Sequence, residues 1–196
     1  MKIIFVLICC FHFVCLAKHP NFILILTDDQ AWSGTSLRMD KRIGNSYGDG
    51  YITPSIRKLA NDGMIFSNGY AAGPVCVPSR SSIQLGQSVA RHGMTSVFKM
   101  KNAFDYHSPD TLAELLKKHD DNYVTAHFGK WHIETEPHVF GFDESDGKTG
   151  NKEGGDDNKT AYQIRINKDP KLTTTLKNRA VDFLRKQAES KKPFFM

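Results

Sequence analysis

The side chains most suited to chemistry are one cysteine and one arginine in the same short stretch. Residues 76–80 read Cys-Val-Pro-Ser-Arg, and the run 81–85 that follows is compatible with a helix that stops at Gly86. Pro78 fits the first turn of such a helix, where its missing N–H costs nothing. Cys76 would then meet the positive end of the helix dipole, with the Arg80 guanidinium within a turn. This setting favours an anion, either a thiolate or a bound oxyanion.

Two further pairs of polar residues each follow an apolar run. Asp28 and Asp29 are adjacent carboxylates that follow the apolar run Phe22–Leu26. Lys130 and His132 flank Trp131 just after the predicted strand Tyr123–Phe128. Each pair has an ordinary structural explanation. The acids could cap a turn or helix, the lysine could form a surface ion pair, and the histidine could donate to a core carbonyl.

The elements that must position these residues alternate between strands and helices. Four apolar runs predict strands, and they are Phe22–Leu26, Met64–Phe66, Tyr123–Phe128 and Phe194–Met196. The first run is typical of a strand that is buried on both faces of a parallel sheet. Three stretches predict helices: one from Thr53-Pro54 to Gly63, one opened by Ser108-Pro109, and one with apolar residues at 172, 176, 180, 183 and 184.

This alternation predicts an α/β fold with a largely parallel sheet flanked by helices. Ligands bind beyond the carboxyl ends of the strands in such sheets. Because each polar pair follows a predicted strand, we expect both pairs along one rim of the sheet. Residues 142–157 are rich in Gly, Asp and Lys and predict a long surface loop.

The N-terminus predicts a signal peptide over residues 1–17. Lys2 precedes an apolar run that is too short for a membrane span, and polar sequence follows at once. The alternative is an uncleaved anchor. Cleavage would leave Cys76 as the only cysteine, either as an inert small residue or as a residue that does chemistry. Asn158-Lys159-Thr160 is a glycosylation sequon, which agrees with a secretory-pathway protein, secreted or lysosomal.

Composition excludes several classes of protein. The 196 residues are 40% apolar and 24% charged, which is ordinary globular composition. The formal net charge is +5, the charged residues are scattered along the chain, and acidic pairs offset the basic doublets. A nucleic-acid-binding protein would concentrate its positive charge on one face or tail, so we expect no nucleic-acid binding. Because the N-terminal apolar run is too short to span a bilayer, we also expect no stable membrane span.

The residues around Cys76 resemble the signature of the sulfatase family. In that signature, Cys-x-Pro-x-Arg directs oxidation of the cysteine to formylglycine in the endoplasmic reticulum. Four other stretches resemble family landmarks in the same order: Pro20 to Gln30, Gly129 to His132, Phe140 to Asp143, and Lys192 to Phe195. The resemblance implies the N-terminal part of an alkaline-phosphatase-like catalytic domain over residues 18–196.

The resemblance also implies a nucleophile and part of a metal site. Asp28 and Asp29 would bind a divalent cation, Ca²⁺ or Mg²⁺, together with the residue derived from Cys76. As a formylglycine hydrate, that residue would attack sulfur with one hydroxyl and use the other to release sulfate. The formylglycine-generating enzyme would be a partner during biosynthesis.

Three further residues receive roles from the resemblance. Arg80 would brace the hydrate and the metal site. Lys130 would hold the sulfate oxygens of a sulfate ester, either a small molecule or a sulfated glycan. His132 would hydrogen-bond the hydrate and help to move its proton.

The chain also departs from the family pattern. It has Gln84-Leu85-Gly86-Gln87 where the family usually has Leu-Thr-Gly-Arg. The family's other metal ligands, a second lysine and another histidine would follow further on, so we expect an incomplete chain that is inactive by itself. Two alternatives stay open: a phosphate or phosphonate hydrolase of the same superfamily, and a truncated secreted protein that binds a sulfated ligand or partner without turnover.

Overall fold

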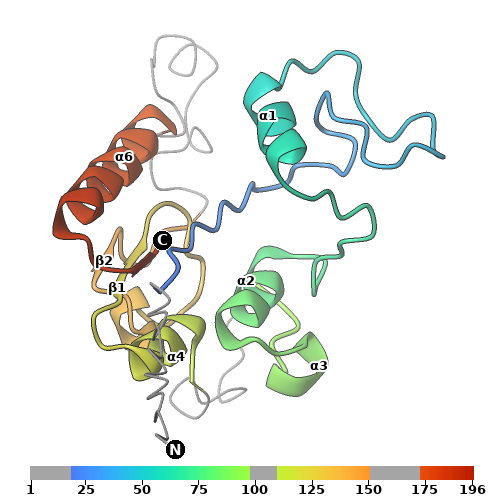
Figure 1. Cartoon of the computed structure of the whole chain (residues 1–196). Helices are drawn as coiled ribbons and strands as arrows, with labels where there is room; N and C mark the ends of the chain where they lie inside the picture. The colour runs from blue at the N-terminus through green and yellow to red at the C-terminus, as the bar shows by residue number, and fades with distance from the viewer. Residues whose placement is uncertain (1–18, 98–109, 151–172) are drawn as a thin grey trace, which may run out of the picture.

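Three parallel strands form the centre of the molecule. The computed structural model describes residues 19–97, 110–150 and 173–196 (Figure 1). Strands β2 (Glu144–Ser145), β1 (Val124–His127) and β3 (Phe194–Phe195) lie in the order β2-β1-β3, and both pairings are parallel. The α/β class and the parallel sheet are therefore confirmed, as are the strands predicted around 123–128 and 194–196. The proposed signal peptide and Asn158 lie outside the described residues.

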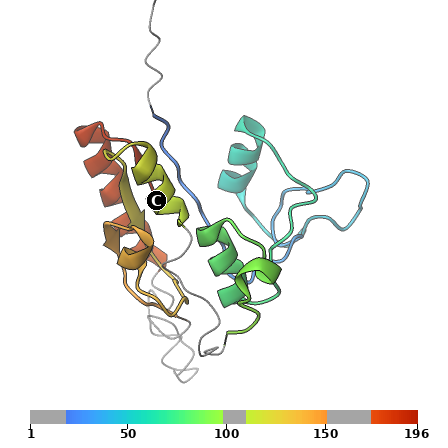
Figure 2. The same cartoon turned by 90° about the horizontal axis from the view of Figure 1, so that it is seen from below.

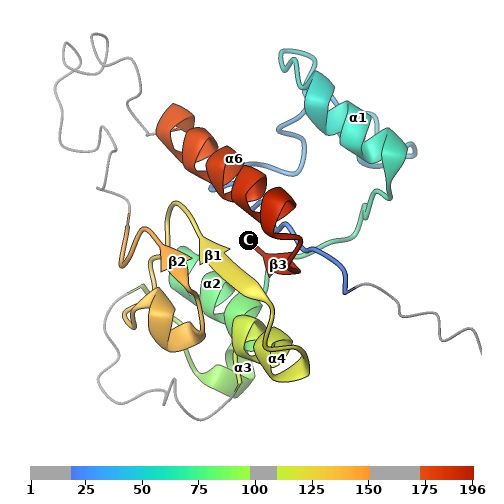
Figure 3. The ribbon, with the colours of Figure 1, turned by 60° about the vertical axis from the view of Figure 1, so that its left-hand side comes forward.

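Helices cover both faces of this sheet, as Figure 3 shows. Adjacent side chains of a strand point to opposite faces, and β3 illustrates this. Phe194 packs with Phe183 of helix α6 (Thr173–Ser190) on one face. Phe195 packs on the other face with Leu85 of helix α2 (Cys76–Leu85) and with Trp131. The sheet is thereby held between α6 on one side and α2 on the other.

Helix α4 (Leu112–His119) lies on the same side as α2. It begins three residues after the predicted opening at Ser108-Pro109, which lies outside the described residues. Its first turn is closed by a capping box. Glu114 N–H donates to Thr111 Oγ1 (3.3 Å), and Thr111 N–H donates to the Glu114 carboxylate (2.8 Å). The Thr111 hydroxyl also donates to Phe140 O (2.7 Å), which joins α4 to the short helix η1 (Pro137–Phe140).

Helix α1 (Pro54–Asp62) was predicted correctly in its start and its stop. Thr53 occupies the N-cap position, but its hydroxyl makes no capping bond. Instead Thr53 Oγ1 accepts the N–H of Ser36 (3.0 Å), because the side chain turns toward the preceding loop. No residue of α1 is buried. In Figure 2 this helix lies at the edge of the molecule, away from the sheet and α6.

Three predictions about strands and loops were wrong. Phe22–Leu26 is not buried on both faces: its side chains are 43–78% exposed, because within the described residues little packs against them. The segment does lie along β3, since Phe22 forms a parallel bridge to Phe195 and Leu24 N–H donates to Met196 O (2.8 Å). Met64–Phe66 is an exposed loop rather than a strand. The loop predicted over 142–157 was wrong at Glu144–Ser145, which form strand β2 because their backbone pairs with β1, and its residues 151–157 lie outside the described residues.

The sequence predicts no stable membrane span. Within the three described ranges, no helix is long and apolar enough to cross a bilayer.

Candidate active site

Cys76 is the first residue of helix α2. It is half-buried, unpaired with any other cysteine in the described ranges, and its first helical turn holds no acidic side chain. The loop before it is fastened to the helix, since Ser79 Oγ donates to Gly73 O (2.7 Å). Gly73 is required there because a Cβ would lie 2.8 Å from the Pro78 Cβ. The sequence thus presents Cys76 at the positive end of a helix, as predicted.

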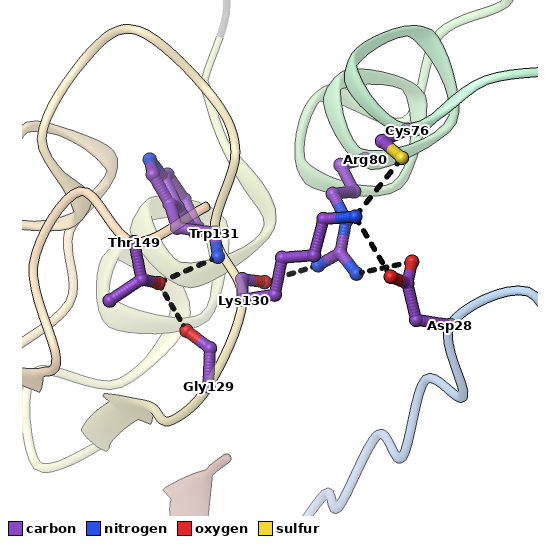
Figure 4. Close-up of polar contacts among 7 residues, drawn as sticks. All are labelled: Asp28, Cys76, Arg80, Gly129, Lys130, Trp131 and Thr149. Carbon is purple, nitrogen blue, oxygen red and sulfur yellow. Dashed lines mark hydrogen bonds and ion pairs between the residues drawn. The ribbon is translucent and has the colours of Figure 1, made fainter. Parts of the chain in front are cut away.

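Lys130 lies in the Lys130 turn, a bend of the chain over residues 129–132 that follows shortly after β1. Gly129 has a φ of 95° and His132 a φ of 57°. Both lie in the left-handed region, which a residue without a Cβ adopts readily and other residues adopt rarely. The Lys130 side chain extends from this segment toward Cys76 and Arg80 of α2, as Figure 4 shows.

Asp28, Cys76, Arg80 and Lys130 form one cluster (Figure 4). Lys130 Nζ donates to Asp28 Oδ2 (2.8 Å) and to Cys76 Sγ (3.1 Å). The Arg80 guanidinium pairs with Asp28 Oδ1 (3.3 Å) and donates to the carbonyl oxygen of Lys130. Residues far apart in the sequence, from three different segments, therefore meet beside the cysteine.

The cluster keeps the Lys130 amine charged. Burial opposes the charge on Lys130, but its bonds to Asp28 and Cys76 outweigh this and raise the pKa of the amine. Burial likewise opposes the charge on Asp28, yet Lys130 and Arg80 together lower the pKa of this carboxyl. The Arg80 and Lys130 side chains are only 10% and 14% exposed, whereas Asp28 is 43% exposed. Two cations against one carboxylate leave a positive environment around Cys76, which suits an anionic ligand.

The other two predicted site residues lie next to this cluster in sequence. Asp29 is exposed and has a φ of 53°, and among the described residues it forms no ion pair. His132 follows Lys130 in the same turn, and its N–H donates to Thr149 O (2.7 Å). The metal-binding role of Asp29 and the proton-transfer role of His132 stay predictions.

Sequence reasoning missed two residues that support the Lys130 turn. Thr149 Oγ1 accepts the N–H of Trp131 (2.9 Å) and donates to Gly129 O. Asp146 accepts the N–H of Gly129 (2.8 Å) and pairs with Arg179 of α6. Both lie in the stretch that was interpreted as a surface loop. No periodicity or spacing in that stretch distinguishes them, because their partners are backbone atoms distant in the sequence.

Comparison with known proteins identifies the family. Residues 20–196 match the family described as Sulfatase. This chain belongs to the sulfatase family. It is 30% identical to N-acetylgalactosamine-6-sulfatase of Homo sapiens over 210 residues, which cover 90% of this chain and 38% of that protein. It is 33% identical to arylsulfatase G of Mus musculus over 132 residues, which cover 65% of this chain and 23% of that protein.

Similar solved structures support the fold. The chain superposes on the crystal structure of Ps i-CgsB with a TM-score of 0.66 and 27% identity, covering 90% of this chain and 43% of that one. The same protein in complex with k-i-k-neocarrahexaose gives a TM-score of 0.64. The chain therefore spans about two fifths of the length of the relatives it matches.

The described part of this sulfatase-family chain does not complete a metal site. Across residues 19–97, 110–150 and 173–196, no group of three His, Cys, Asp or Glu side chains is placed to hold an ion. The Asp28 carboxylate is occupied by the two cations Lys130 and Arg80. Ca²⁺ takes six to eight oxygen ligands in proteins, so two adjacent aspartates do not suffice.

Proposed function

We propose that this chain supplies the nucleophile and the sulfate-binding cations of a sulfate ester hydrolase. The observation that carries the proposal is the contact of Lys130 Nζ with both Cys76 Sγ and Asp28, beside the buried Arg80. Sulfatase membership supports the same reaction class.

The charge of the cluster supports binding of a sulfate ester. Because the pKa of Lys130 is raised, the amine stays protonated at neutral pH and acts as a cation rather than as a base. Arg80 is a permanent cation with several fixed donors. Together they would neutralise the sulfate oxygens and the negative charge that develops as the ester bond breaks.

Formylglycine at position 76, formed from Cys76 by oxidation, would supply a geminal diol as nucleophile when hydrated. The thiol lies at the N-terminus of α2, where the helix dipole favours negative charge on the attacking group. We assign His132 the task of moving a proton at this position, since imidazole titrates near neutral pH. We also propose that Asp28 and Asp29 contribute ligands to Ca²⁺ or Mg²⁺, with the remaining ligands from outside the described residues.

The substrate class that we propose is a sulfated sugar. The relatives include an N-acetylgalactosamine-6-sulfatase, and a similar structure holds k-i-k-neocarrahexaose. Formylglycine formation implies passage through the secretory pathway, with residues 1–17 as the signal peptide. The final compartment would be lysosomal or extracellular.

The first test is the chemical state of residue 76 in the chain produced through the secretory pathway of cultured cells. Mass spectrometry of the peptide that contains residue 76 should detect an aldehyde in place of the thiol. Hydrolysis of an aryl sulfate and of N-acetylgalactosamine 6-sulfate is then measured against the matched aryl phosphate. Cys76→Ser is the control, because serine offers one hydroxyl but lacks the thiol that would be oxidised to formylglycine.

The outcomes separate the candidate functions. An aldehyde with Cys76-dependent cleavage of sulfate but not phosphate supports the proposal. An aldehyde without cleavage supports the nucleophile assignment and contradicts catalysis by this chain alone. An intact thiol without cleavage overturns the proposal and favours a protein that binds a sulfated ligand without turnover.

A further inference from the structure

The turn that carries Lys130 has an unfavourable backbone conformation that its surroundings must hold. Gly129 and His132 both have left-handed φ values, 95° and 57°. For His132, which has a Cβ, this conformation is uncommon and persists where neighbouring contacts determine it. The position of the Lys130 side chain depends on this turn, because its Cα lies between the two residues.

Thr149 contacts the turn on both sides of Lys130. Its hydroxyl accepts the N–H of Trp131 (2.9 Å) and donates to the carbonyl of Gly129. Its own carbonyl accepts the N–H of His132 (2.7 Å). One residue thus bonds three backbone groups of the turn, and Figure 4 shows its hydroxyl between Gly129 and Trp131.

Asp146 provides a second support from the same segment. Its carboxylate accepts the N–H of Gly129 (2.8 Å), and its side chain is only 10% exposed. The carboxylate also pairs with Arg179 of helix α6. The amide before Lys130 is therefore connected to the helix that covers the opposite face of the sheet.

The free end of the lysine is set by these backbone contacts. A lysine side chain has several rotatable bonds and considerable rotamer entropy, so its amine is placed well only when its Cα is fixed. The carbonyl of Lys130 accepts from Arg80, and Thr149 and Asp146 hold the groups around it. We propose that Thr149 is a positioning residue that fixes the Lys130 amine against Cys76, with Asp146 as a secondary brace.

This inference deepens the proposed function, because it concerns the same site, but its test does not need hydrolysis. The full chain is produced without oxidation of Cys76, and the alkylation rate of that thiol by iodoacetamide is measured at pH 7 by peptide mass spectrometry. A nearby ammonium promotes thiolate reactivity. Lys130→Met defines the rate without the amine. Thr149→Val removes the hydroxyl and keeps the shape of the side chain. It should change the alkylation rate of Cys76 by roughly fivefold, toward the rate of Lys130→Met, which is the effect of about one hydrogen bond.

The double variant distinguishes positioning from general loosening. If Thr149 acts through Lys130, Thr149→Val should add nothing in the Lys130→Met background. Thr149→Ser keeps the hydroxyl and should restore the wild-type rate. The matched control is Thr125→Val, since the hydroxyl of Thr125, in strand β1, donates to Gly141 O (2.6 Å) and not to the Lys130 turn. That variant should leave the alkylation rate unchanged.

Asp146→Asn is a milder variant for use if Thr149→Val fails to fold. It should shift the rate in the same direction and should also lose its effect without Lys130. An unchanged rate in folded Thr149→Val, or an effect that persists in the Lys130→Met background, overturns the inference. These results are independent of any aldehyde or sulfate hydrolysis. A chain without hydrolysis but with this coupling would lose the proposed function and keep the positioning role.

Discussion

The charge state of single side chains around the site is set by burial as much as by partners. His127, the last residue of β1, lies between Trp131 and Phe142, with ring centroids 4.8 and 5.7 Å away. Burial, with the nearby Arg80 charge as a second cause, lowers the pKa of His127 to about 4. Within the described residues, the buried Nδ1 atom has no hydrogen-bond partner. The native fold therefore favours neutral His127.

This histidine should make the fold sensitive to acid. Its native pKa of about 4 lies below the ordinary 6.5, so the unfolded chain takes up the proton first. The stabilisation is complete above pH 6.5 and is lost as pH falls toward 4. Between pH 7.5 and 5 we expect a loss of about 2 kcal/mol in the free energy of unfolding, from the linkage of one histidine proton.

Urea unfolding at the two pH values checks this prediction. His127→Leu should remove most of that difference, apart from the part due to buried His92, whose pKa is also lowered by burial. His138→Gln is the control, because it replaces an exposed histidine. A native His127 that titrates near pH 6.5 by NMR would contradict the prediction.

Residue type and spacing were sufficient to find the four side chains of the cluster. Cys76, Arg80, Lys130 and Asp28 each belong to a recognisable short motif, and the structure brings them together. The supports of the site were not predictable in this way. Thr149 acts through backbone atoms 17 to 20 positions away, and such long-range bonds to backbone leave no periodicity or spacing in the sequence.

At the scale of elements, the best-defined helix start is that of α4. The Thr111 hydroxyl accepts from Glu114 N–H and donates to Phe140 O, so it both caps α4 and connects it to η1. Thr111→Ala should lower the free energy of unfolding by about 1–2 kcal/mol, the usual effect of a lost N-cap. Thr111→Ser keeps the hydroxyl and should lose less than half of this. Equal urea midpoints for wild type and Thr111→Ala would show that the cap contributes nothing.

Elements were predictable where a local signal and tertiary packing agreed. β1 and β3 are apolar runs that the core buries, and α1 has Pro54 at its start and Gly63 at its end. Met64–Phe66 has the same apolar character but forms no strand, because a strand requires a neighbour to bond its backbone. β2 shows the reverse, since it is a strand without an apolar run. Its polar residues Glu144 and Ser145 pair with β1 through main-chain bonds alone.

At the scale of the whole molecule, one edge of the sheet remains unpaired within the described residues. Phe22 and Leu24 donate their N–H groups to Phe194 O and Met196 O, both at 2.8 Å, so this segment extends the sheet beyond β3. No strand pairs with its other edge among residues 19–97, 110–150 and 173–196. Ile25 is 78% exposed on this segment. An apolar edge of this kind is a template for pairing with another chain.

The expected consequence is concentration-dependent self-association through that edge. Ile25→Lys should reduce the association seen by sedimentation velocity, because a charged edge residue discourages strand pairing. Ile52→Lys is the matched control, since Ile52 is 90% exposed but lies in a loop away from the sheet. If association followed total exposed apolar area, both variants would reduce it equally. A selective effect of Ile25→Lys would locate the contact between chains at the sheet edge. Equal effects of the two variants would instead assign the association to general apolar exposure, including the uncovered side of α1.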